Sequence, residues 1–186
     1  MRAQRAFFAL LIGGLVLTLP IVSMAQVDSR RIEEVVKKSV LTPADMEIID
    51  AFVSDTVGRL VRTTDFTEVA KTRAVIVSHQ IPQAQYAPRF SEAVFREIGK
   101  GFDYATNEIT DPDRRFKVFT NLLILANELS DPRLADLGVR MIPYDNSTVR
   151  YWAVRAATNP SVWDKLSQNQ AAAAPLTGRI IDACSK

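Results

Sequence analysis

Histidine and cysteine, which often supply catalytic bases, nucleophiles and metal ligands, each occur once in the 186-residue chain, as His79 and Cys184. Single copies exclude a disulfide framework, a zinc cluster and an iron–sulfur site. Ser78 precedes His79, but adjacent residues on a helix point in different directions, so the pair predicts no nucleophile and base. We interpret His79 as a cap at the C-terminal end of a helix.

Other short motifs with chemical meaning are incomplete. Gly99-Lys100-Gly101 contains the Gly-Lys of a phosphate-binding loop, but the earlier glycine and the following Ser or Thr are missing. The acid pairs Glu33-Glu34 and Asp111 with Asp113 are typical of solvated helix ends, with no pocket to separate their pKa values. We therefore predict that the protein is not an enzyme and binds neither a metal nor a cofactor.

Cys184 leaves two interpretations open. In an exported protein a lone thiol can react or link a partner, but free cysteine is also one of the most buried residue types. We favour a buried Cys184, because Ile180, Ile181 and Cys184 share one helical face.

The charged residues nearly balance. The chain has 23 basic and 21 acidic residues, and Arg2 and Arg5 lie in a segment that we expect to be removed. A nucleic-acid scaffold is therefore not expected. The 47% hydrophobic and 24% charged residues are close to ordinary globular usage, which excludes collagen-like, mucin-like and wholly disordered chains.

Residues 1–25 have the three parts of a secretory signal peptide. A start with two arginines is followed by an apolar run, and small residues stand at positions 23 and 25. This pattern predicts cleavage between Ala25 and Gln26 and a periplasmic or secreted protein. The alternative is an uncleaved membrane anchor, since residues 6–27 are uncharged over a length close to that needed to cross a bilayer.

Polar residues followed by proline mark helix starts in residues 26–186, which we treat as a single all-helical domain. Such a pair places a capping side chain before a proline whose missing N–H costs nothing at the first helical position. Asp65 followed by Glu68 adds a start of the capping-box kind. The polar-proline pairs are Thr42-Pro43, Asp111-Pro112, Asp131-Pro132 and Asn159-Pro160.

Apolar residues recur at three- and four-residue steps between these starts, so we predict an all-α fold. Residues 43–62 form one stripe and residues 66–77 a second, in which Ala74-Val75-Ile76-Val77 alone would also fit a buried strand. A third stripe is expected to kink or stop at residues 99–101. Residues 116–126 are apolar nearly all round, which indicates a central helix packed on several sides.

The last third of the chain predicts short helices, and repeat-like units are clearest over residues 111–186. We expect helices over residues 131–141 and 146–158, then two more that are split near Ala174-Pro175, with Ala171 to Ala174 as a helix end and loop. Asn146-Ser147-Thr148 matches a glycosylation sequon, although a helix N-cap is its simpler role.

Residues 145–157, Asp-Asn-Ser-Thr-Val-Arg-Tyr-Trp-Ala-Val-Arg-Ala-Ala, resemble the start of a HEAT-type helical repeat, in which a loop Asp or Asn precedes a Val-Arg pair and an Ala one turn later. Asp131-Pro132-Arg133-Leu134-Ala135 resembles the neighbouring helix start, with Leu134 in place of the usual valine. The resemblance covers about residues 131–166. It implies helical hairpins stacked as a short α-solenoid, or else an irregular helical bundle, with a concave side that binds another protein.

The resemblance also implies roles for single residues. Asp145 and Arg150 are expected to form structural ladder contacts between neighbouring repeats. Tyr151 and Arg155 are candidates for the interaction surface, where an exposed aromatic residue would be an anchor. Trp152 is interpreted as a core residue, because it continues the apolar spacing of its helix.

We therefore predict an exported helical scaffold or protein-interaction module whose partner is another protein, with a membrane involved only if the signal is kept. The alternative is a helical carrier or sensor that holds a small apolar ligand between helices. Its ligand would lie near Phe116, Phe119, Leu123 and Trp163.

The helix expected over residues 176–185 presents an apolar face with no later sequence to cover it. Ends of solenoids normally need a polar cap. This face, which includes Ile181, is therefore expected to pack back on the Trp152 and Trp163 region, to continue into a longer stack, or to pair with a partner.

Overall fold

The computed structural model describes residues 24–168 and 170–185, which form helices and no strand, so the predicted all-α class is confirmed. The helices are α1 (Met24–Val36), α2 (Pro43–Arg62), α3 (Phe66–Ser78), α4 (Tyr86–Asn107), α5 (Pro112–Leu129), α6 (Pro132–Met141), α7 (Ser147–Ala157), α8 (Pro160–Ser167) and α9 (Gln170–Cys184). The predicted signal peptide lies outside the described residues except for Met24 and Ala25, and its cleavage stays a prediction. Within the described part of the chain, no helix combines the length and the apolar character needed to span a membrane.

Each polar-proline pair begins a helix, as predicted. The aspartate or asparagine before the proline accepts a hydrogen bond from the backbone N–H two residues on. Thr42 and Asp45 form a complete capping box, in which Thr42 N donates to Asp45 Oδ2 at 2.9 Å. Asp65 caps α3 by accepting from Thr67 N at 2.8 Å. These side chains satisfy N–H groups that a helix start leaves without partners, so the helix starts follow from the local sequence.

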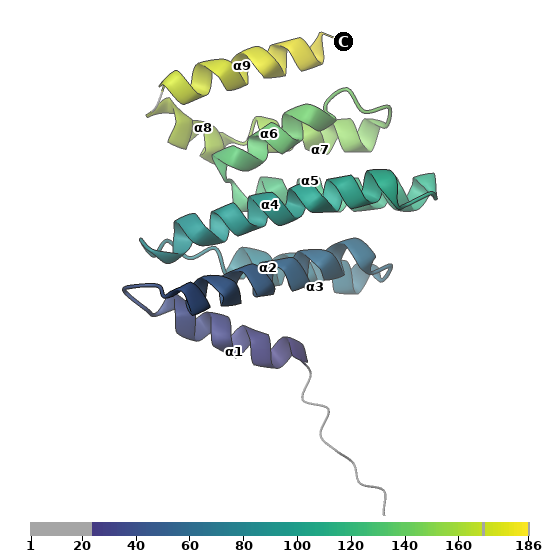
Figure 1. Cartoon of the computed structure of the whole chain (residues 1–186). Coiled ribbons are helices and arrows are strands. Elements are labelled where there is room, and N and C mark those ends of the chain that lie inside the picture. The colour runs from purple at the N-terminus through teal and green to yellow at the C-terminus, as the bar shows by residue number, and fades with distance from the viewer. Residues whose placement is uncertain (1–23, 169, 186) are drawn as a thin grey trace, which may run out of the picture.

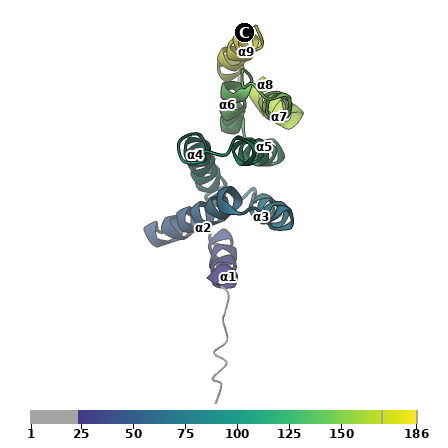
Figure 2. The same cartoon turned by 90° about the vertical axis from the view of Figure 1, so that its right-hand side faces the viewer.

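The helices are arranged as a stack of helical hairpins (Figure 1). α2 pairs with α3, α4 with α5, and α6 with α7. In the view turned by 90°, α2, α4, α6 and α9 form one row and α3, α5 and α7 a second, with α1 against α2 at the N-terminal end (Figure 2). Each helix of a row packs on the next, so the hydrophobic core runs along the stack.

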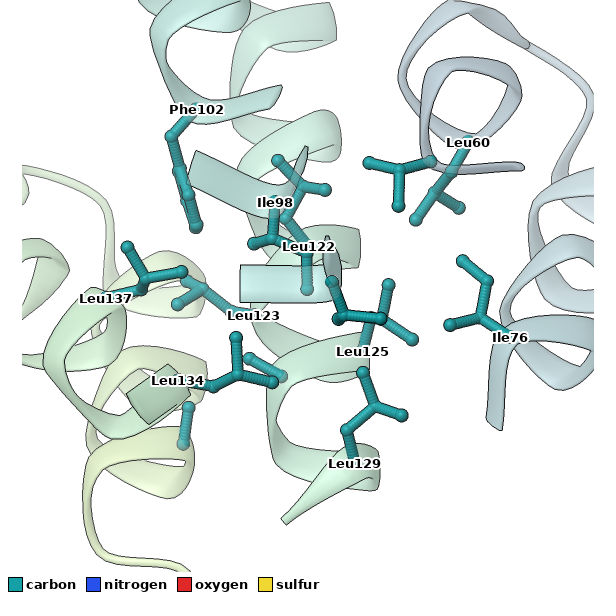
Figure 3. Close-up of a cluster of buried hydrophobic side chains, with 14 of the residues drawn as sticks. Leu60, Ile76, Ile98, Phe102, Leu122, Leu123, Leu125, Leu129, Leu134 and Leu137 are labelled. Atoms are coloured by element: carbon teal, nitrogen blue, oxygen red, sulfur yellow. The ribbon is translucent and has the colours of Figure 1, made fainter. Parts of the chain in front are cut away.

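α5 lies at the centre of this core, as its sequence predicts. It contacts α2, α3, α4, α6 and α7. Leu122, Leu123 and Leu125 are fully buried. Figure 3 shows Leu123 pointing toward α6 and Leu125 toward α3. A helix that is apolar on several sides must be covered on several sides, which explains why both rows of the stack meet at α5.

α4 runs without a break through Gly99 and Gly101, so the expectation that the helix stops there is wrong. A Cβ at Gly101 would lie 3.1 Å from Leu122 Cδ1 and 3.2 Å from Val61 Cγ2, whereas nothing lies within 4 Å of a Cβ at Gly99. Burial of the apolar stripe of α4 against α2 and α5 keeps the helix continuous, and Gly101 allows the three helices to approach closely.

The two ends of the described chain also differ from the sequence analysis. α1 was not expected, and it packs on α2 through the buried Ile32 and Val35. α9 is one helix that includes the alanine run 171–174 and Pro175, where a loop and a split were expected. Alanine has the highest helix propensity, so four alanines before the proline favour helix and outweigh the loss of one backbone donor.

Candidate functional site

The residues that the sequence analysis singled out as an interaction surface lie on α7. Asn146 begins this helix as a cap, as predicted, with its Oδ1 accepting from Thr148 N at 3.0 Å and from Val149 N at 3.1 Å. Val149 and Ala153 are completely buried, and α7 packs on α5 and α6. This register leaves the opposite side of α7, which carries Tyr151 and Arg155, to solvent.

An aromatic and guanidinium cluster occupies the exposed side of α7. Tyr151 is 54% exposed, and its ring meets the ring of Trp152 edge to face with centroids 5.3 Å apart. The Cζ atom of Arg155 lies 6.0 Å from the centroid of each ring, which is within cation–π range. The two rings therefore hold the Arg155 guanidinium at the surface, while the ion pairs of the described residues do not include Arg155.

Trp152 is half-buried, so its interpretation as a core residue is correct only in part. It stands at the border between the buried and the exposed sides of α7. One part of the indole packs against the core, and another part contacts Tyr151 and Arg155 at the surface.

A groove of about 820 Å³ opens between α7 and the C-terminal end of α9. It forms because α9 packs mainly on α6 and α8, through the buried Leu176 and an ion pair between Arg179 and Asp136. Figure 1 shows α9 rising away from α7 toward the C-terminus. We call this feature the α7–α9 groove. Its lining residues are Ile142, Pro143, Ser147, Arg150, Tyr151, Val154, Arg155, Ala183 and Cys184.

The lining of the α7–α9 groove is apolar and basic. Tyr151 and Val154, which is 38% exposed, offer apolar surface. Arg150 and Arg155 carry positive charge, and no acidic residue is among the lining residues. An arginine beside exposed aromatic and aliphatic side chains is the composition that anchors protein–protein contacts.

Asp145 and Arg150 were expected to form ladder contacts with neighbouring repeats, and no ion pair of the described residues represents such a contact. Both side chains are exposed, and neither takes part in an ion pair within the described part of the chain. Asp145 lies in the turn before the Asn146 cap, whereas Arg150 points to the α7–α9 groove. Arg150 is thus part of the groove surface.

Cys184 is exposed, so the favoured interpretation of a buried thiol is wrong. α9 is covered on one side only, by α6 and α8. Of its apolar face, Leu176 is buried but Ile181 is 60% exposed. α9 therefore packs back on α6 and on α8, which carries Trp163, with Leu176 buried and Ile180 and Ala183 partly buried, while Ile181 and Cys184 stay exposed.

Ser78 and His79 are closer than helix geometry predicts, with Ser78 Oγ and His79 Nδ1 3.3 Å apart. The expectation that the two side chains point in different directions is wrong, because His79 is the C-cap of α3 and its backbone has left the helical conformation. Both groups are directed at one acceptor: Ser78 Oγ donates to Val75 O at 2.9 Å, and His79 Nδ1 lies 2.8 Å from the same oxygen. Because a carbonyl oxygen only accepts, Nδ1 must carry a proton to bond to Val75 O, and a protonated Nδ1 cannot take the proton of Ser78. The two side chains instead cap the end of α3, as predicted for His79.

The residues proposed to hold a small apolar ligand do not surround an open site. Phe119 and Leu123 are fully buried, and Phe119 contacts the rings of Phe102 and Tyr144. Trp163 of α8 is directed at the end of α7, where its Nε1 donates to Ala157 O at 3.1 Å. Close packing around Phe119 leaves the α7–α9 groove as the better candidate site.

A charge network between α2 and α4 was missed by the sequence analysis. Asp50 pairs with Arg89 and Arg96, and the buried Glu97 accepts from Arg96 Nε at 2.9 Å and from Lys100 Nζ at 3.0 Å. Burial alone would raise the pKa of Glu97, but the hydrogen bonds from Lys100 and Arg96 outweigh it and lower the pKa. The sequence feature that could have indicated this network is the acidic residue at position 97, which lies on the apolar stripe of α4. Lys100 belongs to this network rather than to a phosphate loop.

Among the described residues, no group of three or more His, Cys, Asp or Glu side chains is placed to hold a metal ion. No family model, curated protein or solved structure matches the chain. The α7–α9 groove and the stack that positions it are therefore the features of the chain that bear on its function.

Proposed function

We propose that the protein is a noncatalytic interaction module that binds a segment of another protein in the α7–α9 groove. Tyr151 and Arg155, which line the groove and contact each other and the half-buried Trp152, carry this proposal. Aromatic residues and arginine dominate the binding energy of protein interfaces, and here they are already held in contact before any partner arrives. We further propose that α6 and α7 form a HEAT-like unit and that the module acts outside the cytoplasm after loss of residues 1–25.

The position of the groove in the stack supports a helical occupant. α3, α5 and α7 follow one another in a row, and each buries one side of the next. The row ends at α7, because α8 packs on α6 and α9. The exposed side of α7 is thus the place where a further helix of the row would lie, and an amphipathic helix of a partner fits this position.

The charge of the groove specifies the partner further. Arg150 and Arg155 line it without a carboxylate partner among the described residues. A partner segment that combines apolar residues with Asp or Glu would neutralise these guanidinium groups and cover Tyr151 and Val154. Charge-assisted hydrogen bonds from arginine to carboxylate are among the stronger contacts available at an interface.

Selection of displayed peptides on the purified protein tests the proposal. We expect selected peptides to contain acidic residues at helical spacing with apolar residues. Tyr151→Ala and Arg155→Glu should each weaken their binding by about ten-fold or more, as for interface anchors. The matched controls are Tyr104→Ala and Arg30→Glu, which change an exposed tyrosine and an exposed arginine elsewhere on the stack.

A label on Cys184 can show whether a selected peptide binds in the α7–α9 groove. Cys184 is the single cysteine of the chain, it is exposed, and it lines the groove, so an environment-sensitive fluorophore on this thiol reports occupancy. The emission should change when a selected peptide binds. Peptides without acidic residues, or binding that the groove variants and the control variants affect equally, would refute the proposed site.

A further inference from the structure

A second groove lies on another part of the stack, between the α2–α3 turn and the first half of α5. Its volume is about 200 Å³, much smaller than that of the α7–α9 groove. We call it the α3–α5 groove. Its lining residues are Leu60, Thr63, Thr64, Phe66, Val69, Asp111, Arg114, Lys117, Val118 and Asn121.

The α3–α5 groove has an apolar floor and an aromatic wall. Leu60, Val69 and Val118 are buried beneath it. Phe66, the first residue of α3, is 67% exposed, which is unusual for a phenylalanine. The Lys117 ammonium lies 5.7 Å from the centroid of the Phe66 ring. One ring face and one cation are therefore presented together at the mouth of a small apolar hollow.

The cations of the α3–α5 groove are poorly neutralised. The ion pairs of the described residues include neither Arg114 nor Lys117. Arg114 donates through Nη2 to Arg62 O at the long distance of 3.5 Å, and its buried Nε has no hydrogen-bond partner. Asp111 also lines the groove, but its Oδ1 accepts from Asp113 N at 3.0 Å as the cap of α5.

We propose that the α3–α5 groove binds a small organic anion with an aromatic body, such as an arylalkyl carboxylate. The carboxylate would accept hydrogen bonds from Arg114 and Lys117, while the ring would pack on Phe66 and the apolar floor. The Nε of Arg114, which is buried without a hydrogen-bond partner, favours an acceptor group in the ligand, because leaving a buried donor unpaired costs free energy. The small volume restricts the ligand to about one ring, and the two cations select an anion over a neutral molecule of the same shape.

Titration of the purified protein with 3-phenylpropionate, followed by calorimetry or by chemical-shift changes, tests this site. The neutral amide of the same acid is the matched ligand, since it keeps the ring and loses the charge. We expect the acid to bind with a Kd of about 1 mM or tighter and the amide to bind about ten-fold more weakly.

Variants locate the binding. Lys117→Gln and Phe66→Ala change exposed side chains, so both proteins should fold, and each should weaken binding of the acid by about five-fold or more. Lys71→Gln, which removes an exposed lysine of α3 outside the groove, should leave binding unchanged.

Three results would overturn the proposal: no binding of the acid at millimolar concentration, equal binding of acid and amide, or equal binding to the wild-type protein and to Lys117→Gln. Loss of acid binding in Arg155→Glu would place the anion in the α7–α9 groove instead. Because the two grooves share no residue, failure here leaves the proposed protein-binding function standing.

Discussion

Replacing Gly138 by alanine should loosen the crossing of α6 and α7, the hairpin that positions the α7–α9 groove. A Cβ at Gly138 would lie 2.8 Å from Ala153 O and 2.9 Å from Ala157 N, both backbone atoms, and 3.2 Å from Ala156 Cβ. Backbone atoms of a packed helix cannot rotate away as side chains can. α7 must therefore move away from α6 by several tenths of an ångström, which disturbs buried contacts along both helices.

The expected change in the free energy of unfolding of Gly138→Ala is the difference between two opposing effects. Alanine is favoured over glycine in a helix interior by about 1 kcal/mol. Overpacking of a filled core costs about 1–3 kcal/mol, and contact with two backbone atoms places Gly138 at the upper end. The net loss is therefore about 2 kcal/mol, which lowers Tm by about 4–8 °C for a chain of this size.

Gly99→Ala is the matched control. Gly99 lies inside α4, and no atom is within 4 Å of the added Cβ. Only the higher helix propensity of alanine remains, so Gly99→Ala should be more stable than the wild type by about 0.5–1 kcal/mol. Thermal unfolding followed by circular dichroism at 222 nm, the helix band, compares the two proteins with the wild type. A Gly138→Ala protein as stable as the wild type would refute the close α6–α7 crossing.

The other predictions concern single sites. Tyr86→Phe should stabilise the protein by about 1 kcal/mol in denaturant unfolding, because the buried hydroxyl has no hydrogen-bond partner and its burial already raises the pKa of Tyr86; a loss of stability would reveal a partner. Hydrogen bonds from Lys38 and Thr42 lower the pKa of Asp45 from 3.8 to about 2, so its contribution to stability should be present above pH 4 and lost as the pH falls toward 2. The Tm difference between the wild type and Asp45→Asn should shrink over that range, and a constant difference would contradict the assignment. Leu176→Ala should cost about 2 kcal/mol or more, whereas Ile181→Asp should leave Tm nearly unchanged, because Leu176 is 3% and Ile181 60% exposed; equal losses would show that all of α9 packs on the stack.

The sequence by itself determined the all-α class and the starts of the helices that a capping side chain begins, which are α2, α3, α5, α6, α7 and α8. The capping contact of Asp65 with Thr67 joins residues two positions apart, and that of Thr42 with Asp45 residues three positions apart. Such contacts depend on little beyond the local chain, and so does the apolar stripe of each helix. The central place of α5 followed from its apolar residues, because they occupy more than one side of the helix and one neighbouring helix could not bury them all. Tyr151 and Arg155, which the resemblance to a HEAT-type repeat implied as an interaction surface, are exposed.

Only the tertiary structure decided which side chains meet across the stack. Arg179 and Asp136 are 43 residues apart, and their ion pair helps to place α9 over α6, which opens the α7–α9 groove and leaves Cys184 exposed. Arg96 and Asp50 are 46 residues apart, and their contact requires α2 beside α4. No local pattern encodes these separations, because the stagger and crossing angle of two helices depend on how all their side chains pack together. The fold class therefore depends on short-range rules, whereas both grooves depend on packing between helices that are distant in sequence.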